Sequence, residues 1–225
     1  QSERLMFLRN LWKRLPTFQI PVVVRTNFWN KVLIWILYFF EFYLKYHFEY
    51  KEIFKQLYSS LKEEKVDYIV HCGDIAHTKT QLSPEFVDMC RDFFENLSNI
   101  APTYIILGNH DGNLRNSSRQ DALTPIVKAL KSPNLHLIKN AKEVILDKKF
   151  CLNILSVFDE ENWIKPTNTE MINIALYHGA IDKSKTDLNW TLGGDHDISI
   201  FDNFDFAFLG DIHKTQHLDK EGRVW

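Results

Sequence analysis

The sequence predicts an α/β fold, because helix and strand patterns alternate through residues 48–131 and strand patterns dominate after that. Segments 48–65 and 83–97 carry apolar residues near helical spacing. Segments 66–72 and 102–107 are short apolar runs, as expected for buried strands. Further strands are expected at 134–139, 142–148, 150–158, 171–179 and 204–211.

The helix predicted at 83–97 has the clearest start signal. Ser83 can cap its first turn, and Pro84 suits the first helical position. Its apolar stripe consists of Phe86, Cys90, Phe93 and Leu97. A shorter helix is expected at 119–131 despite Pro125.

The composition is that of an ordinary globular protein. The length of 225 residues suits one large domain or one domain plus an extension. The net charge of −2 gives no global signal for nucleic-acid binding. Three cysteines without a C-x-x-C spacing argue against a disulfide framework and favour a protein of the reducing interior of the cell. The longest apolar run, 32–40, is shorter than the roughly 20 residues of a membrane span. We therefore expect a cytoplasmic protein without membrane contact.

The chain changes character near its N-terminus. No Gly or Asp occurs before Asp67, and aromatic residues crowd into 28–58. We divide the chain into an atypical aromatic-rich segment, 1–46, and a core, 47–225. Two explanations of the first segment stay open: a native replacement, helical in form, or translation of AT-rich DNA in the wrong frame.

Polar residues follow four of the predicted strands, each time beside a glycine. They are Asp74, Asn109, His110, Asp111, His178, Asp211 and His213. Because ligands of open α/β sheets lie beyond the carboxyl ends of the strands, these side chains are expected to converge. Each alone is compatible with a turn or a structural role. Together, hard oxygen and imidazole donors without thiolates fit Mn²⁺, Fe or Zn²⁺.

The motifs GDIAH, GNHD, YHGA and LGDIH, in this order, resemble those of the calcineurin-like metallophosphoesterases. The longer stretches GDIAHTKTQLSPE and FDFAFLGDIHKTQ resemble the SbcD-type nuclease subunits of DNA double-strand-break repair, in a phage-like version. The resemblance extends from about His47 to the end of the chain. It implies a four-layer α/β/β/α sandwich and two divalent metal ions, which we expect to be Mn²⁺.

The resemblance also implies a role for each metal ligand. Asp74 would bridge the two metals, while Asn109 and His178 would bind the second metal. Asp211 stands where the family more often has a histidine, and would bind the second metal in its place. His213 would bind the first metal.

Two further residues are expected to act in catalysis. His110 would protonate the leaving oxygen or stabilise the transition state, since an imidazole pKa lies near 7. Asp111 would orient the His110 ring. His77 is interpreted as structural.

One motif of the family is missing from this chain. The family begins with a strand that ends in Asp-x-His, but here no Asp precedes Asp67 and no His precedes His47. The first metal would keep only Asp74 and His213, fewer than the three protein ligands typical of catalytic sites. We therefore predict one well-bound metal and one weak or empty site.

The leading interpretation is a metal-dependent DNA nuclease that works with an SbcC-type ATPase, and the resemblance also allows a homodimer. Alternatives are a general metallophosphoesterase acting on a nucleotide or phosphoprotein, and an impaired subunit that lacks the Asp-x-His motif. The family's C-terminal capping region is not visible before the sequence ends at Trp225. Candidate contacts to DNA phosphates are Lys79, Arg115, Arg119 and Lys214.

Overall fold

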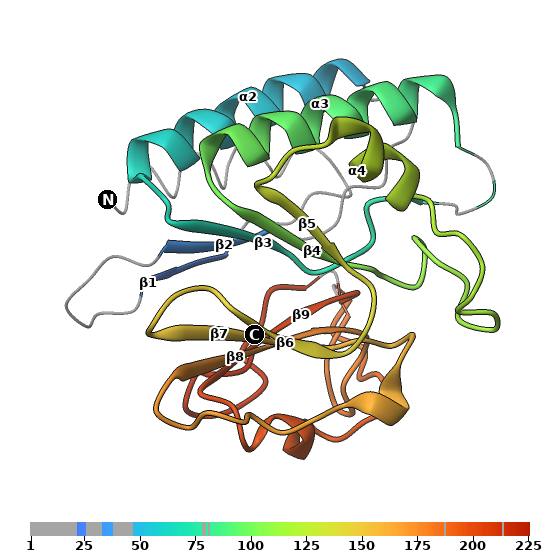
Figure 1. Ribbon diagram of the computed structural model, residues 1–225. Helices are drawn as coiled ribbons and strands as arrows, with labels where there is room; N and C mark the ends of the chain where they lie inside the picture. Colours follow the sequence, from blue (N-terminus) through green and yellow to red (C-terminus); the bar gives the residue numbers. More distant parts are fainter. Residues whose placement is uncertain are drawn as a thin grey trace.

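The computed structural model describes residues 22–25, 33–37, 47–77, 80, 82–186, 188–212 and 214–225. These residues form two β-sheets stacked face to face, with α-helices covering the outer face of the first sheet (Figure 1). The α/β class predicted from the sequence is confirmed.

The first sheet has the strand order β1-β2-β3-β4-β5 in the described residues. The strands are β1 (Val22–Arg25), β2 (Leu33–Leu37), β3 (Tyr68–His71), β4 (Thr103–Ile106) and β5 (Leu135–Ile138). β1 pairs with β2 antiparallel, and the other neighbours are parallel. Parallel neighbours need crossover connections, and these are the helices α2 (His47–Glu64), α3 (Pro84–Ile100) and α4 (Thr124–Leu130).

The second sheet has the order β6-β7-β8-β9. Its strands are β6 (Lys142–Ile145), β7 (Phe150–Leu155), β8 (Ile172–His178) and β9 (Phe206–Gly210). β6 is antiparallel to β7, whereas β7, β8 and β9 are parallel. The carboxyl ends of β8 and β9 therefore lie at one edge of the sheet, with His178 paired to Gly210.

Helix α3 shows the local structure that its sequence predicts. The Ser83 side chain accepts a 3.1 Å hydrogen bond from the backbone N–H of Phe86, so the first turn is capped. Pro84 occupies the first helical position. All four residues of the predicted stripe are buried, so the helical period was correctly identified.

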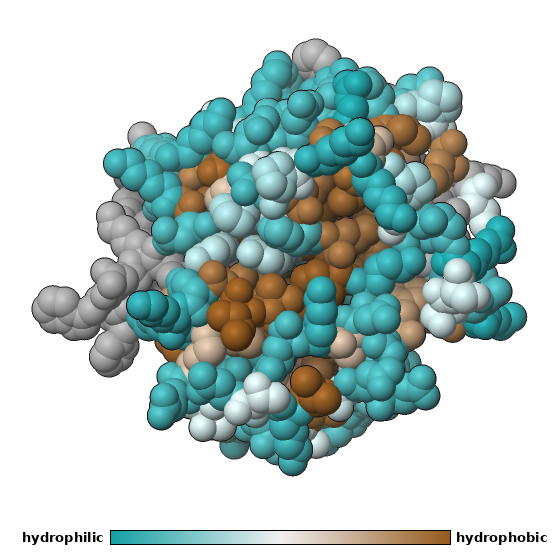
Figure 2. Space-filling view, viewed as in Figure 1, coloured by the Kyte–Doolittle hydropathy of each residue, from teal (hydrophilic) through white to brown (hydrophobic). Residues whose placement is uncertain are grey.

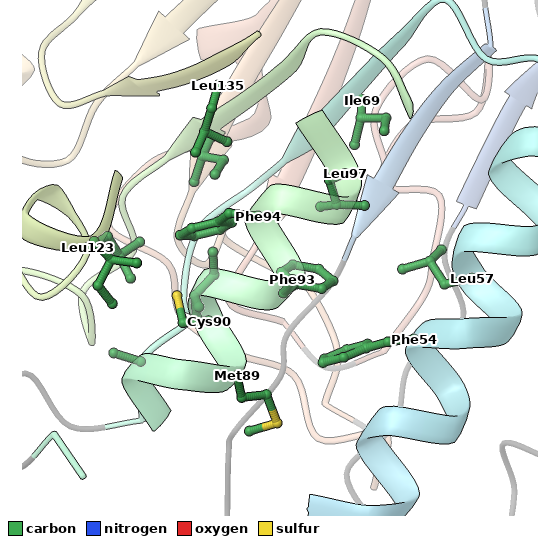
Figure 3. Close-up of a cluster of buried hydrophobic side chains, with 14 of the residues drawn as sticks. Phe54, Leu57, Ile69, Met89, Cys90, Phe93, Phe94, Leu97, Leu123 and Leu135 are labelled. Carbon is green, nitrogen blue, oxygen red and sulfur yellow. The ribbon is translucent and has the colours of Figure 1, made fainter. Parts of the chain in front are cut away.

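The core between the helices and the first sheet is dense in aromatic residues (Figure 3). Phe93 of α3 is fully buried, and its ring centre lies 4.6 Å from that of Phe54 on α2. Ile69 and Ile105 meet these helices from β3 and β4. Each such side chain stabilises the fold by about 1.5–3 kcal/mol on burial.

Alternate residues of the same strands form the core between the two sheets, as the period of two requires. Val70 and Ile106 face this layer from the first sheet. Leu152, Ile174 and Phe208 face it from the second. Figure 2 shows apolar residues reaching the surface in a band across the middle of this face of the molecule.

The outer face of the second sheet is covered by irregular segments and two short 3₁₀ helices, η2 (Glu160–Asn162) and η3 (Ile198–Phe201). Tyr177 of β8 and Leu209 of β9 pack there against Phe201. In the described part of the chain, this fourth layer therefore contains no α-helix.

The atypical N-terminal segment differs from the helical expectation where the structure describes it. Residues 22–25 and 33–37 form strands β1 and β2, and β2 runs parallel to β3 with Leu37 opposite His71. Residues 38–46, which follow β2, lie outside the described residues. None of the helices that the structure describes is both long and apolar enough to cross a membrane.

Candidate metal centre

Asp74 lies in the turn that follows β3, buried to 2% exposure. Its backbone has a positive φ of 57°, a left-handed conformation that is uncommon outside glycine. Gly73, just before it, also has positive φ, at 92°. The Asp74 carboxylate accepts a 2.9 Å hydrogen bond from the backbone N–H of His110, which joins the ends of β3 and β4.

Asp111 holds the turns after β3 and β4 together. Its fully buried carboxylate accepts four backbone hydrogen bonds of 2.8–2.9 Å, from Asp74, Ile75, Ala76 and Gly108. Burial, together with the nearby charge of Asp74, raises the pKa of Asp111 to about 6. Both oxygens are occupied by the backbone of the two turns.

The role expected of Asp111 is therefore wrong. The His110 ring is oriented instead by the backbone carbonyl of His77, which lies 2.7 Å from Nδ1 of His110. The two imidazole rings stack at 5.9 Å between ring centres. Asp111 positions the backbone of Asp74, while His77 orients His110 through its main chain.

His178 ends β8 and is 2% exposed. Its Nδ1 lies 2.6 Å from the backbone carbonyl of Cys72, which fixes the ring and favours a proton on Nδ1. Its other nitrogen, Nε2, lies 3.2 Å from Oδ2 of Asp74 and 3.8 Å from Oδ1 of Asp211. With Nδ1 held in this way, Nε2 is the ring nitrogen that would bind a metal between the two carboxylates.

Asp211 follows β9 and also has positive φ, at 80°. Asp74, His178 and Asp211 each offer one ligand atom, and these atoms lie within 4.8 Å of one another. These three residues are called the metal centre below. Two carboxylates and one imidazole form a hard donor set, so they fit a divalent cation such as Mn²⁺ or Zn²⁺.

The charges of the metal centre indicate the same chemistry. Burial lowers the pKa of His178, but the contact with Asp74 and the charge of Asp211 outweigh burial and raise it to about 9. Burial likewise raises the pKa of Asp74, and the His178 contact reverses this, so that the pKa lies below its ordinary value. The two carboxylates thus favour a positive charge between them, which a bound cation supplies directly.

The glycine beside Asp211 makes this convergence possible. A Cβ atom on Gly210 would lie 2.0 Å from the Cys72 carbonyl oxygen and 2.7 Å from Nδ1 of His178. Both distances are far below van der Waals contact, so only glycine lets β9 approach β3 and His178 this closely.

The structure places the predicted site residues as follows. His110 is exposed beside the metal centre, and Asn109 precedes it, half-buried. Asp74, His178 and Asp211 converge as expected. His213 lies outside the described residues, so its role as ligand of the first metal stays a prediction.

The candidate DNA contacts are placed less uniformly. Arg115 and Arg119 are exposed on the loop after the GNHD motif. Arg119 lines a cavity of about 220 Å³ together with Lys139, whose charge is paired at 2.6 Å with buried Asp121. Lys214 donates a hydrogen bond to Oδ1 of Asn189, while Lys79 lies outside the described residues.

Residues 45–215 match the family model of the calcineurin-like phosphoesterases. The uncharacterized protein R555 of Acanthamoeba polyphaga mimivirus is 36% identical over 196 residues, which are 80% of this chain and 14% of that protein. "Putative phosphoesterase 244L" of Invertebrate iridescent virus 6 is 27% identical over 170 residues, or 69% of this chain and 55% of that one. The chain thus spans only part of the length of both relatives.

Among solved structures, the nuclease MPE of Pseudomonas putida aligns with a TM-score of 0.38 and 14% identity. The alignment covers 71% of this chain and 67% of that one.

Proposed function

The chain belongs to the calcineurin-like phosphoesterases, and from this premise we propose that it hydrolyses phosphodiester bonds of DNA with a divalent cation. The observation that carries the proposal is the meeting of Asp74, His178 and Asp211, whose ligand atoms lie within 4.8 Å although they come from two different sheets. DNA as the substrate is supported by the resemblance of the GDIAHTKTQLSPE and FDFAFLGDIHKTQ stretches to SbcD-type nucleases.

The residues of the site divide the work. Asp74, His178 and Asp211 would bind the cation, and Asn109 and His213 are proposed to complete the ligand set. When bound, a divalent cation polarises a phosphoryl oxygen and lowers the pKa of water. Asp111 fixes the backbone of Asp74, so the carboxylate is oriented before the cation binds.

We propose that His110 protonates the leaving group. The His77 carbonyl accepts from Nδ1–H of His110, so Nε2 is the ring nitrogen of the exposed imidazole that remains for the departing oxygen. Protonation of that oxygen is the step in which a positioned imidazole contributes most.

The substrate can be tested with the full chain in MnCl₂. Hydrolysis of linear duplex and single-stranded DNA is compared with hydrolysis of bis(4-nitrophenyl) phosphate. Asp74→Asn should abolish both activities, and Asp202→Asn, at an exposed position after η3, should leave both unchanged. Hydrolysis of the chromogenic diester without any cleavage of DNA would overturn the choice of substrate and favour a general phosphoesterase.

A second candidate, an impaired phosphoesterase, is favoured because no Asp-x-His occurs in this sequence before Asp74. It would bind one cation without turnover of either substrate in the same assay. An SbcC-type ATPase partner and a homodimer remain predictions from the resemblance.

A further inference from the structure

An exposed tryptophan lies on a hairpin in the segment that follows β8, the strand that ends at His178 of the metal centre. Residues 183–186 and 188–192 form this hairpin, which follows β8 and is closed by the pairing of Lys185 with Thr191. At its tip Trp190 is 69% exposed and Leu188 is 71% exposed. Neither side chain belongs to an apolar core of the described structure.

The hairpin has a defined backbone, so the exposure of Trp190 is a fixed feature of the fold. The backbone N–H of Asn189 donates a 2.9 Å hydrogen bond to the Thr186 carbonyl, and the backbone N–H of Thr186 donates one of 2.9 Å to the Trp190 carbonyl. Asn189 takes a positive φ of 64°, which asparagine tolerates and which three-residue hairpin loops require. The backbone N–H of Trp190 also donates to Oγ1 of Thr186.

The loop that follows Asp211 binds the hairpin directly. Gln216 exchanges two hydrogen bonds with the backbone of Lys185, at 3.1 and 2.9 Å. Lys214 donates to Oδ1 of Asn189, the residue next to Trp190. Since Lys214 is three residues from Asp211, the two Cα atoms are at most about 11 Å apart. The tryptophan thus lies within a few nucleotides of the metal centre.

The segment that forms the hairpin carries two lysines, Lys183 and Lys185, and two aspartates, Asp182 and Asp187. Lys185 is exposed on one strand of the hairpin, and Lys214 contacts its tip. Lys183 is exposed as well, although its charge acts on Asp197 of the following loop. An exposed indole on a hairpin that Lys214 contacts, in the segment after β8, matches the aromatic stacking platforms that bind single-stranded nucleic acids.

We propose that Trp190 is a stacking platform for an unpaired base of the DNA strand whose phosphate enters the metal centre. This inference rests on the proposed function, because it takes DNA as the substrate. Trp190 contributes binding of the strand near the scissile phosphate and takes no part in bond cleavage. Leu188 provides apolar contact to the edge of the same base or of its neighbour.

The test measures binding of a fluorescein-labelled single strand of thymidines to the full chain by fluorescence anisotropy, with Ca²⁺ in place of Mn²⁺. Trp190→Ala should weaken binding roughly 5- to 150-fold, as expected for the loss of one base stacked on an aromatic ring. Trp190→Phe should restore most of the affinity. A strand of abasic sites, which keeps the phosphates but has no bases, should bind wild type and Trp190→Ala equally.

Ile145→Ala is the matched control. Ile145 is also 69% exposed, but it ends β6 opposite Cys151, near the amino end of β7 and away from the strand ends that form the metal centre. Its replacement should leave binding unchanged.

Each outcome separates the two proposals. Equal binding of thymidine strands by wild type and Trp190→Ala would overturn the stacking role while leaving a DNA substrate in place. An equal loss for thymidine and abasic strands would also overturn it, because the effect would then concern phosphates or folding. If wild type binds neither strand yet hydrolyses bis(4-nitrophenyl) phosphate, the DNA substrate itself is overturned.

Discussion

The backbone N–H of Asp74 donates a 2.8 Å hydrogen bond to Oδ2 of Asp111, a carboxylate buried 37 residues further along the chain. The same carboxylate accepts from Ile75, Ala76 and Gly108, so one side chain joins the turns after β3 and β4. The geometry of the metal centre depends on this connection as much as on the ligands themselves.

Replacing Asp111 should therefore destabilise the fold strongly. In Asp111→Asn an NH₂ group would face two backbone N–H donors, and each donor left unsatisfied costs about 1–3 kcal/mol. We expect a loss of several kcal/mol in the free energy of unfolding, measured by urea denaturation without added metal. Asp202→Asn, at an exposed position, should change this free energy by no more than about 0.5 kcal/mol. Similar midpoints for both variants would contradict the structural role of Asp111.

Gly210→Ala should disrupt the metal centre, because its new Cβ would clash with the Cys72 carbonyl at 2.0 Å. We expect lower stability and at least a 10- to 100-fold loss of Mn²⁺ affinity, the range seen when the groups that orient metal ligands are disturbed. Gly193→Ala is the matched control, since no atom lies within 4 Å of its added Cβ. Calorimetric titration of both variants with Mn²⁺ measures this affinity. A Gly210→Ala variant that binds Mn²⁺ as tightly as wild type would refute the close approach of β9 to the Cys72 carbonyl.

His110→Ala should lower kcat about 10²- to 10⁴-fold, the usual contribution of a positioned acid or base. Metal affinity should stay close to that of wild type. His77→Ala keeps the backbone carbonyl that contacts Nδ1 of His110, so its kcat should fall much less. If DNA cleavage by His110→Ala equals that of wild type, the role assigned to this imidazole is wrong.

Titration with MnCl₂ should reveal one tight site and one weak or absent site. The tight site corresponds to the metal centre, and the other lacks the N-terminal Asp-x-His ligands, since no Asp precedes Asp67 in this sequence. Asp211→Asn should weaken the tight site, whereas Asp195→Asn, at an exposed position, should not. Two tight sites of equal affinity would contradict the ligand count.

The convergence of the metal centre could be predicted from sequence because side-chain chemistry and strand ends are both readable. Asp74, His178 and Asp211 each follow an apolar run, and parallel strands bring such positions to one edge. The stripe of α3 was readable for a similar reason, since burial follows the helical period.

The groups that orient the site could not be predicted in this way. The carbonyls of Cys72 and His77 orient His178 and His110, but every residue carries a carbonyl and the sequence marks none of them. Asp111 was expected to orient His110, its neighbour in sequence, whereas three of its four hydrogen bonds come from the turn after β3. Trp190 was missed because its exposure depends on the hairpin, which nothing in the spacing of its residues predicts.

A cation bound by Asp74, His178 and Asp211 would bridge the two β-sheets, since Asp74 follows β3 of the first sheet, whereas His178 ends β8 and Asp211 follows β9 of the second. It would add to the apolar packing and to the contact of His178 with the Cys72 carbonyl, which already join the two layers. Its binding energy would then also contribute to cohesion between the layers. Chelation should lower the melting temperature. It should increase hydrogen exchange first at the strand ends where the cation would connect the two sheets.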